Sequence, residues 1–363
     1  MIYIAWFIVI FTIVQFLVIA ANVIFEPKLP KRRINYKNLV SILIPARNEE
    51  KNIGNILNDL LHQDHRNIEV IVFNDQSSDR TAEIVMEYAK LDSRIKLINS
   101  EGLPEGWLGK NFACYSLAKI AKGAYLLFLD ADVRIKNDIV INAISFSENF
   151  KLGLVSIFPK QIIKTLGEKF TVPVMNYILL SLLPLVLVRK SKFPSFAAAN
   201  GQFMLFNSEI YKSMAPHEMM KNNKVEDIAI ARFFKEQKVK IACLVGDDTI
   251  QCRMYQGFND AVNGFSKNVT AFFGNSFIVA LLFWLTTTFG FLFVLFAFPY
   301  AFFVSYIIVY FATRIFTSMV SKQNIFDNLL YLIPQQISCG LFIYKAFINK
   351  FMKDYQWKGR SIH

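Results

Sequence analysis

The chain has 363 residues, of which 54% are hydrophobic and 36 are phenylalanine, and its mean hydropathy is +0.34. This composition is too apolar for an ordinary soluble enzyme, and the excess lies at the N-terminus, around residues 170–188 and from residue 268 onward. The net charge of +12 beside apolar segments favours cytoplasmic flanks facing anionic lipid over nucleic-acid binding. The four cysteines have no paired spacing, which argues against a disulfide framework or a zinc site and indicates a reducing compartment.

The first apolar segment, residues 1–25, carries no charge and is long enough to cross a bilayer core of about 30 Å. A signal peptide is disfavoured because the positively charged region that precedes its apolar run is missing. We therefore expect a retained transmembrane anchor over residues 1–26. Basic residues follow at once, so the positive-inside rule places the next domain, residues 38–265, in the cytoplasm of a multi-pass cell-membrane protein. These residues are Lys28, Lys31, Arg32, Arg33 and Lys37.

Strands and helices alternate in the next part of the chain. Apolar runs predict strands at 39–46, 69–73, 94–98 and 125–129, and helical spacing predicts helices at 49–62, 79–91 and 111–121. This alternation predicts an α/β fold with a right-handed, mostly parallel, Rossmann-like sheet that binds a nucleotide. A dinucleotide fold is disfavoured, because the first strand runs into PARNEE and no Gly-x-Gly-x-x-Gly occurs in the chain.

The middle of the chain continues with a helix at 139–150, a strand at 153–160 and a helix that begins near Lys224. Between them, residues 170–188 are uncharged but interrupted by Pro173 and Pro184. A membrane span and an interfacial or lid segment over residues 170–190 are both open interpretations. We prefer the second, because a span here would split the sheet domain across the membrane.

The C-terminal part is again apolar. Residues 268–313 carry no charge and fit a transmembrane hairpin with a turn near Pro299. Residues 328–350 predict a further membrane or re-entrant segment, since basic residues lie on both sides of it and a full crossing would violate the charge rule. Residues 351–363 form a basic C-terminal tail.

Two carboxylates on alternate positions, Asp130 and Asp132, directly follow the apolar run 125–129. Ligands of open α/β sheets bind beyond the carboxyl ends of the strands. Two aspartates there are costly to bury unless a divalent cation compensates them. On the tripeptide alone, an aspartate-rich turn is the favoured interpretation, so the rest of the chain has to decide.

An ordered set of motifs decides it. The pieces SILIPARNEE, FNDQSSDRT, LGK, FLDADV, VEDIAIAR and CRMY follow one another between residues 41 and 255. In this order they resemble the motifs of membrane-anchored family 2 glycosyltransferases, which implies the GT-A fold of nucleotide-diphospho-sugar transferases with N-terminal and C-terminal transmembrane helices. The stretches WLGKNFACYSL, RMYQGF and WKGR are most similar to carotenoid-acid (diaponeurosporenoate) glycosyltransferases of staphylococcal type and to hopanoid-associated glycosyltransferases.

The resemblance implies a UDP-sugar donor. Asp75, at the end of the second strand, would accept the imide N–H of uracil, although it is also placed to form a turn. Pro45 and Ala46 would line the same pocket, and Glu49 would face the ribose. The family's acidic-acidic-Gly pattern is Asn74-Asp75-Gln76 here, which weakens the assignment of uracil as the nucleobase of the donor.

Three further residues would serve the diphosphate. Lys110 ends the loop 101–110 and can meet a phosphate as a point charge, although by itself it reads equally well as a solvated lysine. Asp130 and Asp132 would hold Mg²⁺ or Mn²⁺, which bridges the diphosphate and stabilises charge on the leaving nucleotide.

A second acidic pair, Glu226-Asp227, would serve the acceptor side of the site. By resemblance, Asp227 is the base of an inverting displacement and Glu226 its supporting neighbour, while the local alternative is a pair of acids at a helix N-terminus. Arg253 would contact the diphosphate or the acceptor, with Tyr255 beside it. The related Gln-x-x-Arg-Trp motif is one residue short here and lacks its Trp. His217 is expected at the surface, with a contact to the metal or the acceptor as the alternative.

The predicted function is the inverting transfer of a sugar, with glucose as the first expectation, from a UDP-sugar to a membrane lipid. The resemblance favours a carotenoid or terpenoid acid such as diaponeurosporenoate. A carboxylate is already ionised at neutral pH and needs no base, so the intact acidic pair favours a hydroxyl acceptor such as a hopanoid, diacylglycerol or ceramide-like lipid. A nucleotidyltransferase is a weaker alternative because a Gly-rich phosphate loop is missing after the first strand, and a non-catalytic scaffold is weaker because all four key aspartates are present. A polysaccharide synthase is a further, less favoured alternative.

Overall fold

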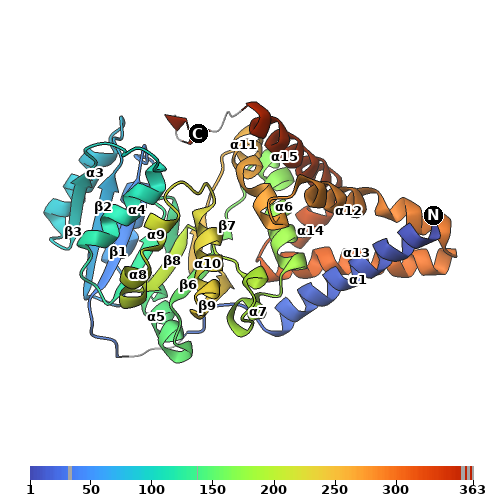
Figure 1. Cartoon of the computed structure of the whole chain (residues 1–363), viewed down its shortest axis with the longest axis horizontal. Coiled ribbons are helices and arrows are strands. Elements are labelled where there is room, and N and C mark those ends of the chain that lie inside the picture. The colour runs from blue at the N-terminus through green and yellow to red at the C-terminus, as the bar shows by residue number, and fades with distance from the viewer. Residues whose placement is uncertain (32–34, 137, 353–355, 358–359, 362–363) are drawn as a thin grey trace. The chain divides into compact units, whose positions relative to one another are not determined.

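The computed structural model describes residues 1–31, 35–136, 138–352, 356–357 and 360–361, with side chains as far as Lys350 (Figure 1). The chain divides into two compact units. The first, here called the sheet unit, comprises Pro27–Lys160 and Leu185–Arg253. The second, here called the helical unit, comprises Met1–Glu26, Gln161–Pro184 and the chain from Met254 onward. Arg32, Arg33 and the Lys358-Gly359 part of WKGR lie outside the described residues.

A seven-stranded sheet of order β3-β2-β1-β4-β8-β6-β9 forms the centre of the sheet unit. Its strands are parallel except β8, which runs antiparallel to both β4 and β6. The strands are β1 (Val40–Ala46), β2 (Ile68–Asn74), β3 (Ile95–Asn99), β4 (Tyr125–Leu129), β6 (Leu154–Phe158), β8 (Phe203–Asn207) and β9 (Ile241–Val245). The mostly parallel sheet predicted from the alternation of strands and helices is therefore present.

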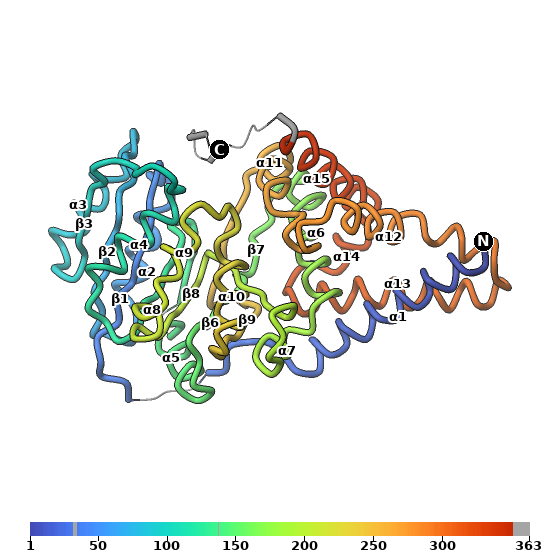
Figure 2. Tube along the Cα trace, viewed as in Figure 1, coloured from blue at the N-terminus to red at the C-terminus, as the bar shows by residue number. Residues whose placement is uncertain are grey.

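Continuous apolar strands form here because helices cover the sheet. All residues of β2 and β4 are buried, as expected for strands packed on both faces. Helix α2 (Ile53–Leu61) turns Ile53, Ile56, Leu57 and Leu60 inward at helical spacing. The other helices of this unit, traced in Figure 2, are α3 (Thr81–Leu91), α4 (Gly109–Ile120), α5 (Ile139–Phe150), α7 (Leu185–Lys190), η1 (Pro194–Phe196), α8 (Ser208–Met214), α9 (Pro216–Met219) and α10 (Glu226–Glu236).

A small second sheet of order β5-β10-β7 was not predicted from the sequence. Its strands are β5 (Val133–Ile135), β10 (Ile250–Cys252) and β7 (Lys160–Gln161). Strand β5 starts directly after Asp132, and its antiparallel register pairs Val133 with Cys252. Such short strands escape prediction because they are too short to show a period.

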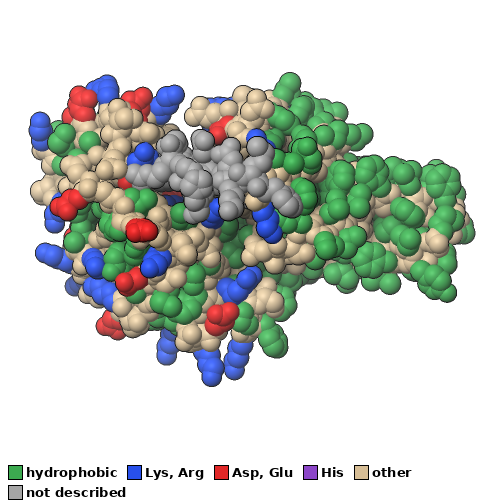
Figure 3. Space-filling model, turned by 45° about the horizontal axis from the view of Figure 1, so that its top comes forward, with side chains coloured by type: hydrophobic (Ala, Val, Ile, Leu, Met, Phe, Trp, Pro, Cys, Tyr) green, Lys and Arg blue, Asp and Glu red, His purple; other side chains and the backbone are tan. Residues whose placement is uncertain are grey.

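The helical unit contains α1 (Ile2–Ile24), α6 (Leu166–Leu182), α11 (Phe258–Asn268), η2 (Val269–Phe273), α12 (Phe277–Ala297), α13 (Tyr300–Val320), α14 (Ile325–Leu330) and α15 (Leu332–Met352). The short strands β11 (Gln356–Trp357) and β12 (Arg360–Ser361) follow. Three of the described helices, α1, α12 and α13, are long and apolar enough to cross a membrane. Figure 3 shows hydrophobic side chains gathered on one face of this unit, while charged side chains are spread over the sheet unit.

Polar side chains join α1 to α6 inside the helical unit. Gln15 donates to the Ser181 hydroxyl at 3.0 Å, and Asn22 donates to the carbonyls of Leu180 and Leu183, both at 2.9 Å. Helix α6 begins with a capping box between Thr165 and Glu168. The run predicted at 170–188 is thus divided between α6 and α7, which belong to different units.

Candidate active site

The predicted donor residues lie where parallel strands of the sheet unit end. Pro45 and Ala46 close β1, Asp75 follows β2, and Asp130 follows β4. Because β1 is paired in parallel with both β2 and β4, these carboxyl ends share one edge of the sheet. Ligands of open α/β sheets bind at this edge.

Asp75 is held beside the end of β1. Its side chain is 2% exposed, and its backbone N–H donates to the Ala46 carbonyl at 2.8 Å. The Arg47 guanidinium donates to the Asp75 carbonyl at 2.7 Å and lies 3.8 Å from its carboxylate. Arg47 was not singled out in the sequence, although it stands in the PARNEE motif.

Glu49 is also at this edge, and its surroundings fix the start of the next helix. Its N–H donates to the Thr81 hydroxyl at 2.8 Å, and its carboxylate accepts from the Asn52 amide at 2.9 Å. Asn74 accepts from the N–H of Ser77 at 3.1 Å and so helps to close the turn after β2.

Asp130 and Asp132 lie in a tight turn between β4 and β5. The Asp130 N–H donates to the Gln202 carbonyl at 3.2 Å, and its own carbonyl accepts from Val133 at the same distance. Beside them, the Gln202 amide donates to the Cys252 sulfur at 2.8 Å. Burial raises the pKa of Cys252 well above its usual value, and the neighbouring Asp132 carboxylate adds to this. The thiol therefore stays protonated next to Asp132.

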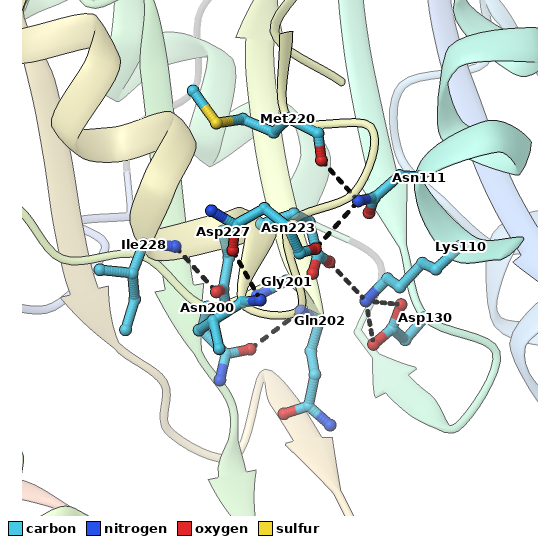
Figure 4. A network of polar contacts seen from close by, with 12 residues as sticks. Lys110, Asn111, Asp130, Asn200, Gly201, Gln202, Met220, Asn223, Asp227 and Ile228 are labelled. Atoms are coloured by element: carbon cyan, nitrogen blue, oxygen red, sulfur yellow. Dashed lines mark hydrogen bonds and ion pairs between the residues drawn. The ribbon is translucent and has the colours of Figure 1, made fainter. Parts of the chain in front are cut away.

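Lys110, at the start of α4, bridges two acids from distant parts of the sequence (Figure 4). Its ammonium lies 2.9 Å and 3.0 Å from the two oxygens of Asp130 and 3.4 Å from Glu226. Burial by itself would lower the pKa of Lys110, but the carboxylates of Asp130 and Glu226 raise it well above its usual value. Lys110 is therefore a fixed positive charge in this site, and the solvated-lysine alternative is wrong.

Asp227 begins α10 next to this bridge. Its carboxylate accepts from the N–H of Gly201 at 2.9 Å and from that of Ile228 at 2.8 Å (Figure 4). Burial and the neighbouring Glu226 carboxylate raise the pKa of Asp227 to about 7, although Lys110 and the two N–H groups oppose this. A carboxylate with a pKa near neutral suits general-base chemistry.

The donor set fits a divalent cation that completes its shell from a substrate. Asp130 and Asp132 offer hard carboxylate oxygens, which Mg²⁺ and Mn²⁺ prefer. Within the described part of the chain, no group of three or more His, Cys, Asp or Glu side chains is arranged to hold a metal. Magnesium sites commonly combine one or two carboxylates with substrate phosphates, so two aspartates are sufficient.

The remaining predicted residues are divided between the units. Arg253 follows β10, one position beyond Cys252, and so comes close in the chain to the ladder that carries the Asp132 turn. Tyr255 belongs to the helical unit, where its ring packs edge-on against Phe265 at 4.7 Å between centroids. Gln251 donates to Asp248 at 3.0 Å.

His217 is not at the surface, and that prediction is wrong. It is 2% exposed, its ring nitrogen lies 2.7 Å from the Tyr211 hydroxyl, and its ring contacts Phe128 at 4.9 Å between centroids. Burial, with a contribution from Lys110, lowers its pKa to about 3. The polar sequence around His217 gave no sign of the aromatic residues that surround it in the fold.

Two residues of the small-residue stretch FAAANGQF also belong to the site. The Asn200 carboxamide accepts from the Gln202 N–H at 2.9 Å and so shapes the turn around Gly201. A side chain at Gly201 would place its first carbon 3.0 Å from the Lys110 nitrogen and 3.3 Å from Glu226. The glycine therefore leaves room for the charged groups, which explains why residue 201 has no side chain.

Comparison with known proteins agrees with this geometry. Residues 41–215 match the family model described as glycosyl transferase family 2. The chain contains a glycosyltransferase family 2 domain. The predicted resemblance is therefore confirmed.

Two curated relatives share this domain. The chain is 28% identical over 242 residues to "4,4'-diaponeurosporenoate glycosyltransferase" of Staphylococcus haemolyticus (strain JCSC1435), in a match that covers 66% of this chain and 63% of that protein. It is 29% identical over 259 residues to the protein of the same name from Staphylococcus aureus (strain USA300), covering 69% of this chain and 66% of that protein. The chain thus spans just under two thirds of the length of these relatives.

The fold of this chain is also found in a solved structure. Mannosyltransferase PcManGT from Pyrobaculum calidifontis, in complex with GDP-Man and Mn2+, superposes with a TM-score of 0.51 at 15% identity, over 95% of this chain and 99% of that chain. The predicted GT-A fold is confirmed.

Proposed function

We propose that this chain is an inverting glycosyltransferase that moves a sugar from a UDP-sugar to a membrane-lipid acceptor. The observation that supports this most is the bridge from Asp130 through Lys110 to Glu226, with Asp227 beside it. The groups come from three segments of the chain, and they would serve as metal site, phosphate-binding charge and base. Metal-assisted transfer of a sugar from a nucleotide to a hydroxyl acceptor uses these three groups in one place.

The donor end of the site is assigned to the edge of β1 and β2. Asp75 would accept the imide N–H of uracil, with Pro45, Ala46 and Glu49 around the nucleoside. The Arg47 contacts support this role, because they hold Asp75 in place at the end of β1. The archaeal mannosyltransferase of the same fold carries GDP-Man and Mn2+, which supports a nucleoside-diphospho-sugar as the class of donor.

Asp130 and Asp132 would hold Mg²⁺ or Mn²⁺ against the donor diphosphate. The cation would supply positive charge that stabilises the departing UDP. Lys110 would bind the same diphosphate. Its ammonium contacts Asp130, so phosphate oxygens held by a cation on that carboxylate would also be close to Lys110. Arg253 would add a second positive charge, and Tyr255 would contact the acceptor.

Asp227 would accept the proton of an acceptor hydroxyl while the acceptor oxygen attacks the anomeric carbon. The bond between that carbon and the diphosphate breaks as the new glycosidic bond forms, and UDP leaves with the electron pair. Glu226 supports this step because its charge keeps the pKa of Asp227 near neutral. A carboxylate acceptor would form an ester in the same displacement without giving up a proton.

The first candidate acceptor is a carotenoid or terpenoid acid, and the sugar is glucose. The name of the two staphylococcal relatives supports this acceptor. The second candidate is a hydroxyl-bearing lipid such as a hopanoid, diacylglycerol or ceramide-like lipid. It is supported by the raised pKa of Asp227, a property that a carboxylate acceptor does not need.

The membrane arrangement is part of the proposal. Residues 1–26 and the hairpin within 268–313 would anchor the chain, 328–350 would be a further membrane or re-entrant segment, and 38–265 would be a cytoplasmic catalytic domain with an interfacial or lid segment at 170–190. The three apolar helices α1, α12 and α13 support the anchors. A lipid acceptor is the natural substrate of an enzyme held at its own membrane.

The purified full chain with UDP-glucose and Mn²⁺ tests the proposal. UDP release should rise when lipid extract is added, and mass spectrometry should find a lipid heavier by one hexose. The extract is divided into acidic and neutral lipids, so that the labelled fraction identifies the acceptor class. If no nucleotide-sugar donor yields a hexosylated lipid, the proposal is wrong.

A further inference from the structure

Asn111 is a buried side chain next to Lys110 that the proposed chemistry does not use. It is 1% exposed and lies in the first turn of α4. Its amide nitrogen donates to the carbonyls of Met220 at 2.7 Å and Asn223 at 3.0 Å, and a third carbonyl, that of Lys221, lies at 3.3 Å (Figure 4). A carboxamide has two N–H donors, so this one side chain uses its full donor capacity on a single short loop.

The loop in question, residues 220–225, leads directly into Glu226 and Asp227. A second bond ties it to the same end of α4, from the N–H of Leu108 to the Lys221 carbonyl at 2.8 Å. The loop is also closed on itself, because the Asn223 carboxamide accepts from the N–H of Val225 at 3.0 Å. The position of α4 therefore determines where the chain enters α10.

Helix α4 carries a charge contact as well. Lys110 holds Asp130 and Glu226 at 3.4 Å or less, and Asn111 holds the backbone that precedes Glu226. Charge contacts alone would let a flexible lysine follow the acids as they move. The buried carboxamide fixes the loop backbone, because a carbonyl that loses its partner inside the protein is costly.

We propose that Asn111 is a positioning residue that fixes the 220–225 loop to α4 and thereby sets the base Asp227 relative to the metal-binding turn at Asp130. The inference rests on the proposed function, since it requires Asp227 to act on the acceptor. Asn111 touches neither substrate nor metal in this arrangement. It acts through the loop, and displacement of a base by about 1 Å is enough to lower a rate roughly a hundredfold.

Two variants separate positioning from packing. Asn111→Asp keeps size and shape but replaces the donor by an acceptor that faces three carbonyls. Asn111→Leu keeps the volume and removes all polar atoms. The control is Asn142→Leu, which changes a buried asparagine of another helix, α5.

Hydrogen exchange of the full chain tests the loop directly. In both Asn111 variants, peptides that cover 221–228 should exchange at least tenfold faster than in the wild type, while those that cover β1 and β2 stay unchanged. Asn142→Leu should leave 221–228 unchanged. Equal exchange of 221–228 in the wild type and both Asn111 variants would overturn the inference, whether or not the chain transfers sugar.

Steady-state kinetics test the consequence. With UDP-glucose and a hydroxyl-bearing acceptor, kcat should fall at least tenfold in both variants while KM for the donor stays within about twofold. A fall of the melting temperature with unchanged kcat, or a loss of donor binding in proportion to kcat, would contradict a positioning role. A wild-type chain without any transfer would sink the proposed function instead, and the exchange result would still decide the role of Asn111.

Discussion

The raised pKa of Asp227 makes a quantitative prediction about the transfer reaction. A group with a pKa of about 7 is roughly one tenth ionised at pH 6 and about nine tenths ionised at pH 8. Transfer to a hydroxyl acceptor requires the ionised form, so kcat should rise about tenfold between these pH values. An aspartate with the ordinary pKa of about 4 would be fully ionised across this range and would give a flat profile.

The same shift should affect stability. Because the pKa of Asp227 is higher in the folded chain than in the unfolded one, its contribution to stability is complete below about pH 4 and is lost as the pH rises through about 7. Three pKa units correspond to at most about 4 kcal/mol. Asp227→Asn removes the charge and keeps only one of the two oxygens that accept from the backbone N–H groups of Gly201 and Ile228, so it carries a cost in stability at every pH. The melting temperature of Asp227→Asn relative to that of the wild type should therefore be higher at pH 8 than at pH 4.

The assay compares the wild type, Asp227→Asn and the control Glu236→Gln, an exposed acid at the other end of α10. Initial rates of UDP release are measured from pH 6 to pH 8 with a hydroxyl-bearing lipid and with a polyene carboxylic acid. Asp227→Asn should lose most transfer to the hydroxyl and keep much of that to the acid, which needs no base. A flat wild-type profile with the hydroxyl lipid, or full activity of Asp227→Asn on it, would refute the assignment of the base.

The other predictions concern the donor side of the site. Asp132→Ala should lower the rate of UDP release about a hundredfold or more and should weaken Mn²⁺ binding, measured by calorimetry in the presence of UDP. The control Asp64→Ala, at an exposed position, should change neither quantity. An unchanged rate of UDP release in Asp132→Ala would exclude the metal assignment. Lys110→Met should lower kcat roughly a hundredfold, with Lys119→Met on the exposed side of the same helix as control, and near-normal rates would show that the bridge is only structural. Asp75→Ala should raise KM for UDP-glucose by roughly tenfold to a hundredfold through the lost hydrogen bond to uracil, and an unchanged KM would place the base elsewhere.

Local pattern was sufficient for most of the elements. The apolar runs of β1, β2 and β4 and the spacing of Ile53, Ile56, Leu57 and Leu60 in α2 reflect burial that each segment requires wherever it packs. The two C-terminal apolar helices also followed from composition, with their break at Phe298-Pro299. The short strands β5, β10 and β7 did not, because they exist only through pairing with each other.

For the candidate site, too, some features followed from the sequence and others only from the fold. The sequence by itself determined which acids are candidates for the site, since motif order picks out Asp75, Asp130, Asp132 and Asp227. Only the tertiary structure decided their electrostatics: Lys110 became a bridge rather than a solvated cation, and Asp227 acquired a pKa near neutral. The physical reason is that a pKa depends on burial and on charges within a few ångströms, and the residues that supply them here come from β4, α4 and α10. Their spacing along the chain does not predict that contact.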